Sequence, residues 1–272
     1  MRDKGRLVVT LSAIFTPDQR PEQILPVAAA AEAAGMTHLW VWEDCFKESG
    51  IATATAMLAT TSRLTVGIGL LPVPLRNVAL TAMELATVSR LFPGRLMPGI
   101  GHGVLSWMGQ VGARAESPLA LLREYTSALY ALLHGETVTV HGRYVNLDEV
   151  ALDWPPAVPP PLLVGGVKPR TVELAGELAD GVIISSGPSP DEIRATAGHF
   201  RSSRPDGAGP GDVVVFTHAC AASPARDIAA MVSAYAAAGA THVAVNADER
   251  DADLERFVTL LAREVSPLVR SD

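Results

Sequence analysis

Short apolar runs alternate along the chain with longer segments of helical periodicity. An apolar run bounded by turn residues is typical of a strand buried on both faces, and apolar positions three and four apart are typical of an amphipathic helix. The predicted strands lie at 6–15, 37–43, 64–71, 95–100, 161–166, 181–186, 212–220 and 241–246. The predicted helices lie at 21–34, 50–61, 76–91, 117–134, 168–178, 189–202, 224–238 and 249–266.

Eight strand–helix units in this order predict an α/β fold, namely a closed (β/α)8 or TIM barrel in preference to an open doubly wound sheet. Two near-repeats, 31–42 and 235–246, each join an alanine-rich helix end to a strand through a glycine suited to a left-handed cap, Gly35 and Gly239. One segment breaks the alternation. Residues 136–147 alternate around His141-Gly142 and predict a β-hairpin between the fourth helix and the fifth strand.

Length and composition suit one large domain over residues 1–272, with 48% hydrophobic and 19% charged residues. The net charge of −7 argues against nucleic acid or anionic membrane as a partner, and no apolar run approaches the roughly 20 residues of a membrane span. The apolar run behind the basic N-terminus lacks a signal-peptide cleavage site and is predicted to be the first strand. Cys45 and Cys220 form neither a disulfide framework nor a zinc motif, so we expect a reduced, cytoplasmic setting.

The fourth predicted strand ends in glycines at alternate positions, Gly99, Gly101 and Gly103. Glycines there remove the side chains from the end of the strand, so a flat ligand has bare backbone to lie against. The alternative is a sharp strand-to-loop turn. The spacing is not the dinucleotide fingerprint, because Val104 stands where the last glycine of that pattern belongs.

The end of the fifth predicted strand has the features of an anion site. Gly165 and Gly166 allow close approach, and Pro169 suits the first turn of the next helix, whose positive end would face the ligand beside Lys168 and Arg170. The alternative is a capped helix with solvated basic residues.

Each of the other side chains near the predicted strand ends has a functional and a structural interpretation. Asp44 is either an acceptor for a ring N–H or an exposed acid. Cys45 is either a proton donor or nucleophile, or an inert thiol, and neighbouring acids favour the inert thiol because they do not lower its pKa. Trp107 lines a ring pocket or belongs to the core. His102 and His218 face the barrel mouth in this reading, but the histidines show no metal-binding spacing and we expect no metal.

The order and spacing of these segments resemble the bacterial luciferase-like monooxygenase superfamily, and most closely its branch of oxidoreductases that depend on the deazaflavin coenzyme F420. The likeness covers residues 6–186 and rests on 42–45, 66–70, 93–103, 106–112, the hairpin at 136–147, 163–168 and 174–184.

The resemblance implies a barrel that holds a flavin or deazaflavin at the carboxyl ends of its strands, a homodimer, and a non-prolyl cis peptide at Gly69-Leu70. It places Asp44 near the cofactor ring, beside Gly69 and Leu70. The remaining residues that it assigns to the cofactor follow the fourth and fifth strands: Gly101, His102, Gly103 and Trp107 along the ring and ribityl chain, and Val164, Gly165, Gly166, Val167 and Lys168 near the phosphate.

Two positions depart from the F420-dependent pattern. Cys45 stands where those enzymes carry histidine, and Val104 stands where they carry an acid. Cys45 and His102 are therefore the candidates for handling a proton.

The resulting hypothesis is an oxidoreductase that transfers a hydride between F420 and a small organic substrate. The alternatives are an FMN-dependent luciferase-like monooxygenase, and a binding protein that holds a flavin or deazaflavin without turnover. A hydrolase is disfavoured, because the sequence shows no nucleophile motif. A basic groove running outward from Lys168 would favour F420 over FMN, because F420 carries an anionic glutamate tail.

Overall fold

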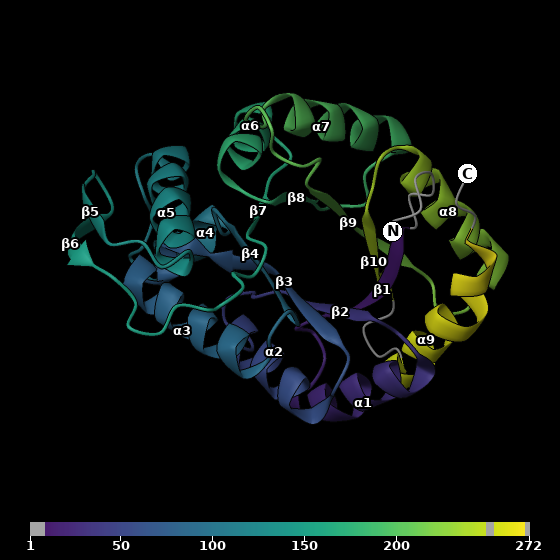
Figure 1. The fold of residues 1–272 in the computed structure, drawn as a ribbon. Helices are drawn as coiled ribbons and strands as arrows, with labels where there is room; N and C mark the ends of the chain where they lie inside the picture. The colour runs from purple at the N-terminus through teal and green to yellow at the C-terminus, as the bar shows by residue number, and fades with distance from the viewer. Residues whose placement is uncertain (1–8, 249–252, 270–272) are drawn as a thin grey trace.

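The computed structural model describes residues 9–248 and 253–269. Within them, eight parallel strands close into a barrel in the order β1-β10-β9-β8-β7-β4-β3-β2. The strands are β1 (Thr10–Phe15), β2 (His38–Val41), β3 (Thr65–Pro72), β4 (Leu96–Gly101), β7 (Leu163–Gly165), β8 (Gly181–Ile184), β9 (Asp212–Ala219) and β10 (His242–Ala247). The barrel predicted from the alternating pattern is confirmed, and its helices form the outer ring seen in Figure 1.

The helices also follow the predicted order. They are α1 (Ile24–Ala34), α2 (Gly50–Thr60), α3 (Val78–Leu91), α4 (Leu105–Gln110), α5 (Pro118–Leu133), α6 (Pro169–Leu178), α7 (Pro190–Ser202), α8 (Ala225–Ala237) and α9 (Leu254–Leu260). A π-helical turn at Leu261–Val265 and a 3-10 turn at Ser266–Leu268 follow α9, and further 3-10 turns lie at Pro21–Gln23 and Val73–Leu75. Parts of the first predicted strand (6–8) and last predicted helix (249–252) lie outside the described residues.

Local sequence explains the helix ends. Gly35 and Gly239, the glycines of the two near-repeats, have φ of 90° and 109°, so each takes the left-handed conformation that ends a helix. Ser189 and Glu192 form a reciprocal capping box at the start of α7. Pro169 occupies the first turn of α6, as predicted.

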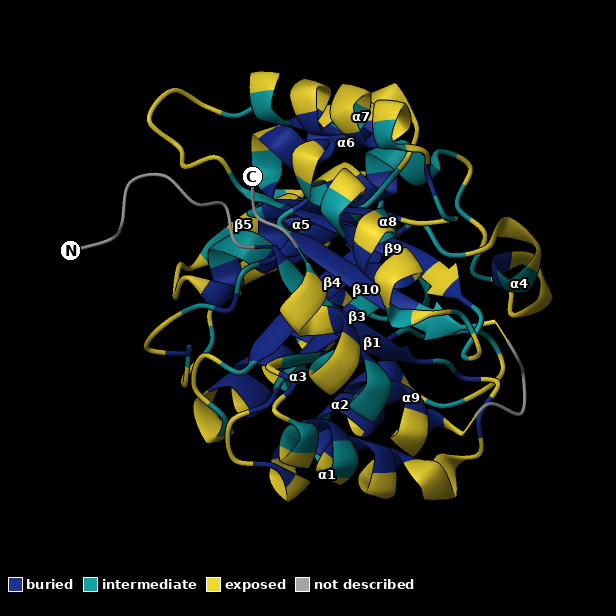
Figure 2. Cartoon of the chain, turned by 90° about the vertical axis from the view of Figure 1, so that its right-hand side faces the viewer, coloured by how far each residue is buried: buried dark blue, intermediate teal, exposed yellow. Residues whose placement is uncertain are grey.

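Two elements near α5 are the β5–β6 hairpin, which the sequence predicts, and helix α4, which it does not. The hairpin of β5 (Val138–His141) and β6 (Asn146–Val150) is confirmed, and Figure 1 shows it outside the barrel beside α5. Helix α4 was not predicted, because six residues are too few to show helical periodicity. Figure 2 shows α4 standing off the body with mostly exposed residues.

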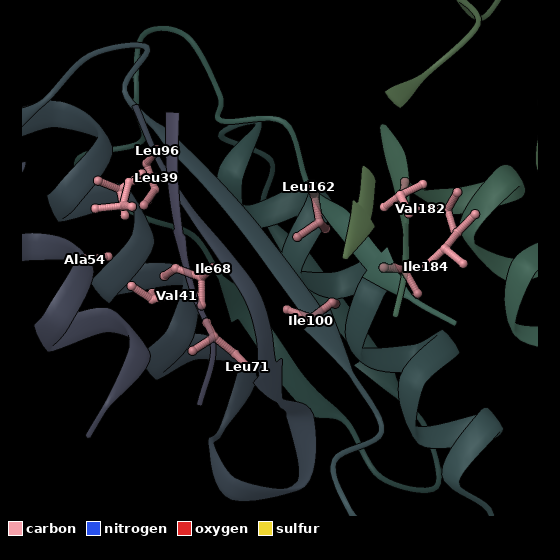
Figure 3. Packing of buried hydrophobic residues seen from close by; sticks show 14 of the residues in the cluster. Leu39, Val41, Ala54, Ile68, Leu71, Leu96, Ile100, Leu162, Val182 and Ile184 are labelled. Atoms are coloured by element: carbon pink, nitrogen blue, oxygen red, sulfur yellow. The ribbon is translucent and has the colours of Figure 1, made fainter. Parts of the chain in front are cut away.

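The hydrophobic core has two layers. One packs the outward side chains of the strands against the helices, and Figure 3 shows Val41 and Ile68 beside Ala54 of α2. The second fills the barrel interior with the fully buried Trp40 and with Met97, Leu163, Ile183 and Phe216. Because the interior is packed, a ligand has room only above it, at the ends of the strands.

Candidate active site

A cavity of about 1080 Å³ opens at the carboxyl ends of the barrel strands. Residues at the ends of β2, β3, β4, β7, β8, β9 and β10, or in the segments directly after them, line it, so nearly the whole rim contributes. Its size suits a ligand larger than a single ring, since cofactor and drug-sized sites typically occupy about 300–1,000 Å³.

Aromatic and aliphatic side chains form the floor. Phe216 lies against Gly69, where an added Cβ would come within 2.4 Å of Phe216 Cζ. Its ring meets that of Trp40 edge-on at 5.3 Å between centroids and is tilted against Trp42 at 6.1 Å. Phe216, Trp42 and Ile183 all line the cavity, so the floor presents apolar surface to a bound ligand.

The end of β3 carries one extra residue relative to β4. Ile68 pairs with Pro98 and Leu71 pairs with Ile100, so Gly69 and Leu70 face Gly99 alone. The peptide bond between Gly69 and Leu70 is cis, as the family resemblance implied. A second non-prolyl cis peptide, between Cys45 and Phe46, had no counterpart in the sequence reasoning.

The backbone at Gly99, Gly101 and Gly165 is covered by side chains, whereas the sequence predicts that it is open to a ligand. Added Cβ atoms at Gly101 and Gly165 would come within 2.6 Å and 2.1 Å of Leu70 Cδ2, so the Leu70 side chain covers both strand ends. An added Cβ at Gly99 would come within 2.5 Å of Ile183 Cδ1. These glycines therefore make room for neighbouring side chains. Gly103 has φ of 69° and itself lines the cavity.

A buried ion pair fixes the loop after β2. Glu43 accepts from Arg76 through both carboxylate oxygens, at 2.5 Å to Nη1 and 2.7 Å to Nη2, and also accepts from the backbone N–H of Gly50 at 2.8 Å. The two side chains are 7% and 16% exposed. Because each charge is neutralised by the other, Glu43 contributes little free charge to the cavity that it lines.

The next two residues of this loop behave differently. Asp44 lines the cavity and accepts a hydrogen bond from Trp42 Nε1 at 3.1 Å. Cys45 is not among the lining residues, and burial together with the Glu43 and Asp44 carboxylates raises the pKa of its thiol. The thiol is therefore protonated at neutral pH, in line with the inert alternative considered from the sequence.

His102 follows β4 and lies beside the start of α6, which follows the neighbouring strand β7. Its Nε2 is 3.2 Å from Thr171 Oγ1 on α6. Burial, reinforced by the positive charge of Lys168, lowers its pKa. The ring is therefore neutral at pH 7.

Positive charge is concentrated where β7 passes into α6. Gly165, Gly166, Val167, Lys168 and Arg170 all line the cavity here. No side chain caps α6, and its first turn lines the cavity, so the positive end of the helix dipole lies beside the cavity. Lys168 and Arg170 are exposed at the rim, which makes this edge the electropositive side of the site.

The ends of β8, β9 and β10 supply further polar side chains, of which the sequence singled out only His218. Ser185, Ser186, Thr217, His218 and Asn246 line this wall. His218 Nε2 is 4.0 Å from Asp248 Oδ1, which follows β10. The only sequence signal for these residues is their position at the end of a strand or directly after it, which becomes informative once the barrel is known.

The structure thus gathers most of the predicted site residues around one cavity. Asp44, Gly69, Leu70, His102, Gly103, Trp107, Gly165, Gly166, Val167 and Lys168 line it. Gly101 lies beneath Leu70, and Val164 belongs to the outer core layer. Within the described ranges no cluster of three or more metal-ligating side chains occurs, and no helix there is long and apolar enough to cross a membrane.

The fold and cavity coincide with a recognised family. The sequence pattern of the luciferase-like monooxygenases matches residues 7–267, and the chain belongs to this family. It is therefore an oxidoreductase of the luciferase-like kind, and the proteins it matches include an F420-dependent dehydrogenase and an FMN-bound monooxygenase.

Among the similar proteins, 5,10-methylenetetrahydromethanopterin reductase of Methanolobus tindarius is 27% identical over 236 residues, which cover 85% of this chain and 72% of that protein. The F420-dependent glucose-6-phosphate dehydrogenase of Nakamurella multipartita is 30% identical over 190 residues, covering 62% of this chain and 54% of that protein. The chain thus spans about half the length of the dehydrogenase.

Solved structures agree on the fold. An F420-dependent secondary alcohol dehydrogenase in complex with an F420-acetone adduct superposes with a TM-score of 0.85 at 17% identity, over 97% of this chain and 99% of that one. The oxygenating constituent of 3,6-diketocamphane monooxygenase from Pseudomonas putida, in complex with FMN, gives a TM-score of 0.78 at 15% identity, over 97% and 99% of the two chains. At such identities the likeness concerns the fold alone.

Proposed function

We propose that this protein transfers a hydride between coenzyme F420 and a small organic substrate. The observation that carries the proposal is the electropositive edge of the cavity, where Lys168 and Arg170 stand at an open rim beside the uncapped start of α6. Such an edge suits a cofactor whose phosphate continues into an anionic tail, because the tail can leave the cavity past these two cations. The F420-dependent relatives support the same choice.

The residues present fit a cofactor of this kind. Gly166 leaves no room for a side chain, since an added Cβ would come within 2.6 Å of Thr171 Cγ2, so backbone alone faces a phosphate there. Gly165, Gly166, Val167 and Lys168, next to Val164, would hold the phosphate. Asp44, Gly69, Leu70, Gly103 and Trp107, with His102 beside them and Gly101 beneath Leu70, would line the ring and its side chain. When bound, the deazaflavin would supply hydride transfer.

Proton handling falls to few side chains. Glu43 accepts hydrogen bonds from Arg76 through both carboxylate oxygens, and Asp44 accepts one from Trp42. Cys45, whose thiol pKa is raised, and His102, whose imidazole pKa is lowered, are the two candidates that the sequence offered. Of the two, only His102 lines the cavity, so we propose that Cys45 takes no part in the reaction.

A fluorescence titration of the apo-protein with F420 and, separately, with FMN tests the proposal. We expect F420 to bind tightly and FMN to bind more weakly, because only F420 carries the tail that Lys168 and Arg170 would meet. Tight binding of FMN without binding of F420 would replace the proposal with a flavin-dependent monooxygenase. Binding of F420 without turnover of any substrate would leave a binding protein.

We also propose that the protein is a homodimer. Helix α2 carries no charged residue, and the neighbouring α3 exposes Leu80, Met83 and Leu91 at 47%, 58% and 64%. Exposed apolar side chains beside an uncharged helix are typical of a surface that a second copy covers. Light scattering of the parent protein should give the mass of a dimer, and the double variant Met83→Glu, Leu91→Glu should give a folded monomer. A monomeric parent would contradict this proposal.

A further inference from the structure

We propose that His218 is the residue that gives the substrate its proton, and that the reactive group of the substrate is an uncharged carbonyl group. This assignment rests on the proposed hydride transfer and deepens it, because it names a catalytic residue and a class of substrate. Three features carry it: the polar side chains at the ends of β8, β9 and β10, the surroundings of the His218 ring, and the state of the other titratable groups in the cavity.

The residues that line the cavity form two arcs. In the closed order of the barrel, β7, β4, β3 and β2 follow one another, and so do β10, β9 and β8. The residues assigned above to the cofactor belong to the first four strands and their loops. The polar wall, which consists of Ser185, Ser186, Thr217, His218 and Asn246, belongs to the other three strands. A cofactor on the first arc therefore leaves the polar wall for the substrate.

The pleat of the strands sets the height of this wall. Side chains at alternate positions of a strand lie on the same face. Phe216 of β9 and Ala244 of β10 belong to the packed barrel interior, so His218 and Asn246, two positions further along, lie one layer above it. His218 and Asn246 are also register partners, so they stand side by side. Both therefore stand immediately above the floor on which a bound ligand would rest.

The polar wall offers hydrogen bonds without a fixed charge. None of the described lining residues contributed by β8, β9 and β10 is a lysine, an arginine or a carboxylate. The Asn246 amide donates to the Ala247 carbonyl at 3.1 Å, which leaves its second hydrogen for a ligand. The Ser185 residue is exposed at the wall. A carbonyl oxygen accepts from such groups, whereas an ionic substrate would find no opposite charge there.

The neighbours of the His218 ring decide which nitrogen faces a ligand. Nε2 is 4.0 Å from Asp248 Oδ1, and among the residues that the structure describes no other charged side chain lies within ion-pair distance of the ring. The edge that carries Cε1 and Nδ1 lies against Gly187, where an added Cβ would come within 3.2 Å and 3.5 Å of these atoms. Gly187 lines the cavity, so Nδ1 is the nitrogen that a ligand beside it can reach.

The other titratable groups of the cavity are not placed to serve the substrate. Within the described ranges, those that line the cavity belong to the cofactor arc, and they are Glu43, Asp44, His102, Lys168 and Arg170. Nε2 of His102 is 3.2 Å from Thr171 Oγ1, beside the position proposed for the phosphate. The lowered pKa of His102 also keeps its ring neutral at pH 7. His218 is therefore the group left to protonate a substrate on the polar wall.

The proposed step balances in atoms and electrons. A hydride from the reduced cofactor forms the new bond at the carbonyl carbon, and the π electron pair of the carbonyl group moves to oxygen. His218 Nδ1 gives its proton to that oxygen, so the product is an alcohol and the ring is left neutral until solvent reprotonates it. The substrate gains the two electrons that the cofactor loses. His218 thereby replaces the acid and the histidine whose positions Val104 and Cys45 occupy.

Binding of a ketone without turnover tests the polar wall. Acetophenone and its isostere α-methylstyrene, in which a methylene group replaces the carbonyl oxygen, are titrated by calorimetry into the protein loaded with oxidised F420, which has no hydride to give. We expect acetophenone to bind about five-fold more tightly, because only its oxygen accepts hydrogen bonds. Asn246→Ala should remove most of this preference and leave the affinity for α-methylstyrene unchanged. Equal affinities in the parent protein would overturn the class of substrate.

Single-turnover reduction of ketones by reduced F420 tests His218. Acetophenone, cyclohexanone and 2-butanone are offered, and the return of the absorbance of oxidised F420 is followed. We expect reduction of at least one ketone, at a rate that falls at least about five-fold between about pH 5.5 and 8 as the imidazolium is lost. His218→Gln should be at least about 100-fold slower and independent of pH, with unchanged affinity for F420. The matched control, His141→Gln on the exposed hairpin, should behave like the parent.

Imidazole added to His218→Ala separates proton transfer from a structural role. The side chain is 60% exposed in the open cavity, so imidazole can reach its place. We expect a rate increase of at least about ten-fold, larger at about pH 6 than at about pH 8. An unchanged rate in His218→Gln, or no rescue by imidazole, would overturn the role of His218. If F420 binds and none of the ketones is reduced, the class of substrate is wrong. Neither result affects the proposed function, which fails only if F420 does not bind in the preceding titration.

Discussion

The two ends of the barrel carry the same kinds of polar side chain in contrasting arrangements. At the beginning of the strands, the His38 and His242 rings lie 5.2 Å apart, and His242 Nε2 is 3.6 Å from Asp212 Oδ1. At the other end, His102, His218 and Asp44 line an open cavity. Histidine and aspartate are therefore no guide to function by themselves in this chain. Their position along the strand decides whether they pack against one another or face a ligand.

The near-repeats explain the closed cluster of His38, His242 and Asp212 at the beginning of the strands. Each repeat places a Thr-His pair at the start of a strand, where His38 is the first residue of β2 and His242 the first residue of β10. Thr241 donates to Asp212 at 3.1 Å, and His38 Nδ1 is 3.0 Å from Thr37 Oγ1. The barrel brings the two copies together although about two hundred residues separate them, since β1 is paired with both β2 and β10.

The largest expected effect is at the cavity end. Glu43→Ala should lower the free energy of unfolding by about 3 kcal/mol, because it leaves the largely buried Arg76 with only the longer contact to Glu84, at 3.7 Å. Urea denaturation measures the change. Glu116→Ala removes a glutamate that pairs with Arg143 at an exposed site and should cost less than about 1 kcal/mol. Equal losses in the two variants would show that the buried pair has no special role.

The second effect concerns the closed cluster. Burial, followed by the charge of the neighbouring His242, lowers the pKa of His38 to about 4. An unfolded histidine has a pKa of about 6.5, so below that pH the unfolded chain binds the proton more readily. Stability is complete above about pH 6.5 and should fall by about 2–3 kcal/mol as the pH drops to 4.

His38→Gln tests this origin of acid sensitivity. Denaturation midpoints measured between pH 7 and 4 should fall less steeply in this variant than in the parent. His141→Gln, on the exposed hairpin, is the matched control and should keep the slope of the parent. An unchanged slope in His38→Gln would assign the acid sensitivity to other groups.

The smallest expected effect is on cofactor affinity. Lys168→Gln combined with Arg170→Gln should weaken F420 binding by about ten-fold and leave stability unchanged, because both side chains are exposed at the rim. Arg226→Gln, with its side chain 82% exposed on α8, should change neither property. If the double variant bound F420 as well as the parent, the electropositive edge would have no part in binding the tail.

The sequence was sufficient for the fold because its signals are local and repeated. Short apolar runs, capping glycines and the first-turn Pro169 each predict an element within a few residues. Helix α4 escaped because it is short and exposed. The segments that line the cavity could also be located from the sequence, because in a barrel they lie at the predicted ends of the strands.

What the sequence could not supply are contacts between distant residues. The pair of Glu43 and Arg76 joins positions 33 residues apart, and nothing local in either segment announces it. His218 and Asp248 approach each other only because β9 and β10 are neighbours. The glycine pattern predicts open backbone at Gly101 and Gly165, whereas the Leu70 side chain, from a third strand, fills the space above them.

Because of this packing, substitutions at positions 70, 101 and 165 should depend on one another during evolution. The side chain at 70 already fills the volume that a methyl group at 101 or 165 would need. A homologue that acquires alanine at either glycine should therefore carry a smaller residue at 70. A homologue that keeps leucine there should keep both glycines. Correlated substitution at these three sites, counted across an alignment, would reveal this packing without any structure.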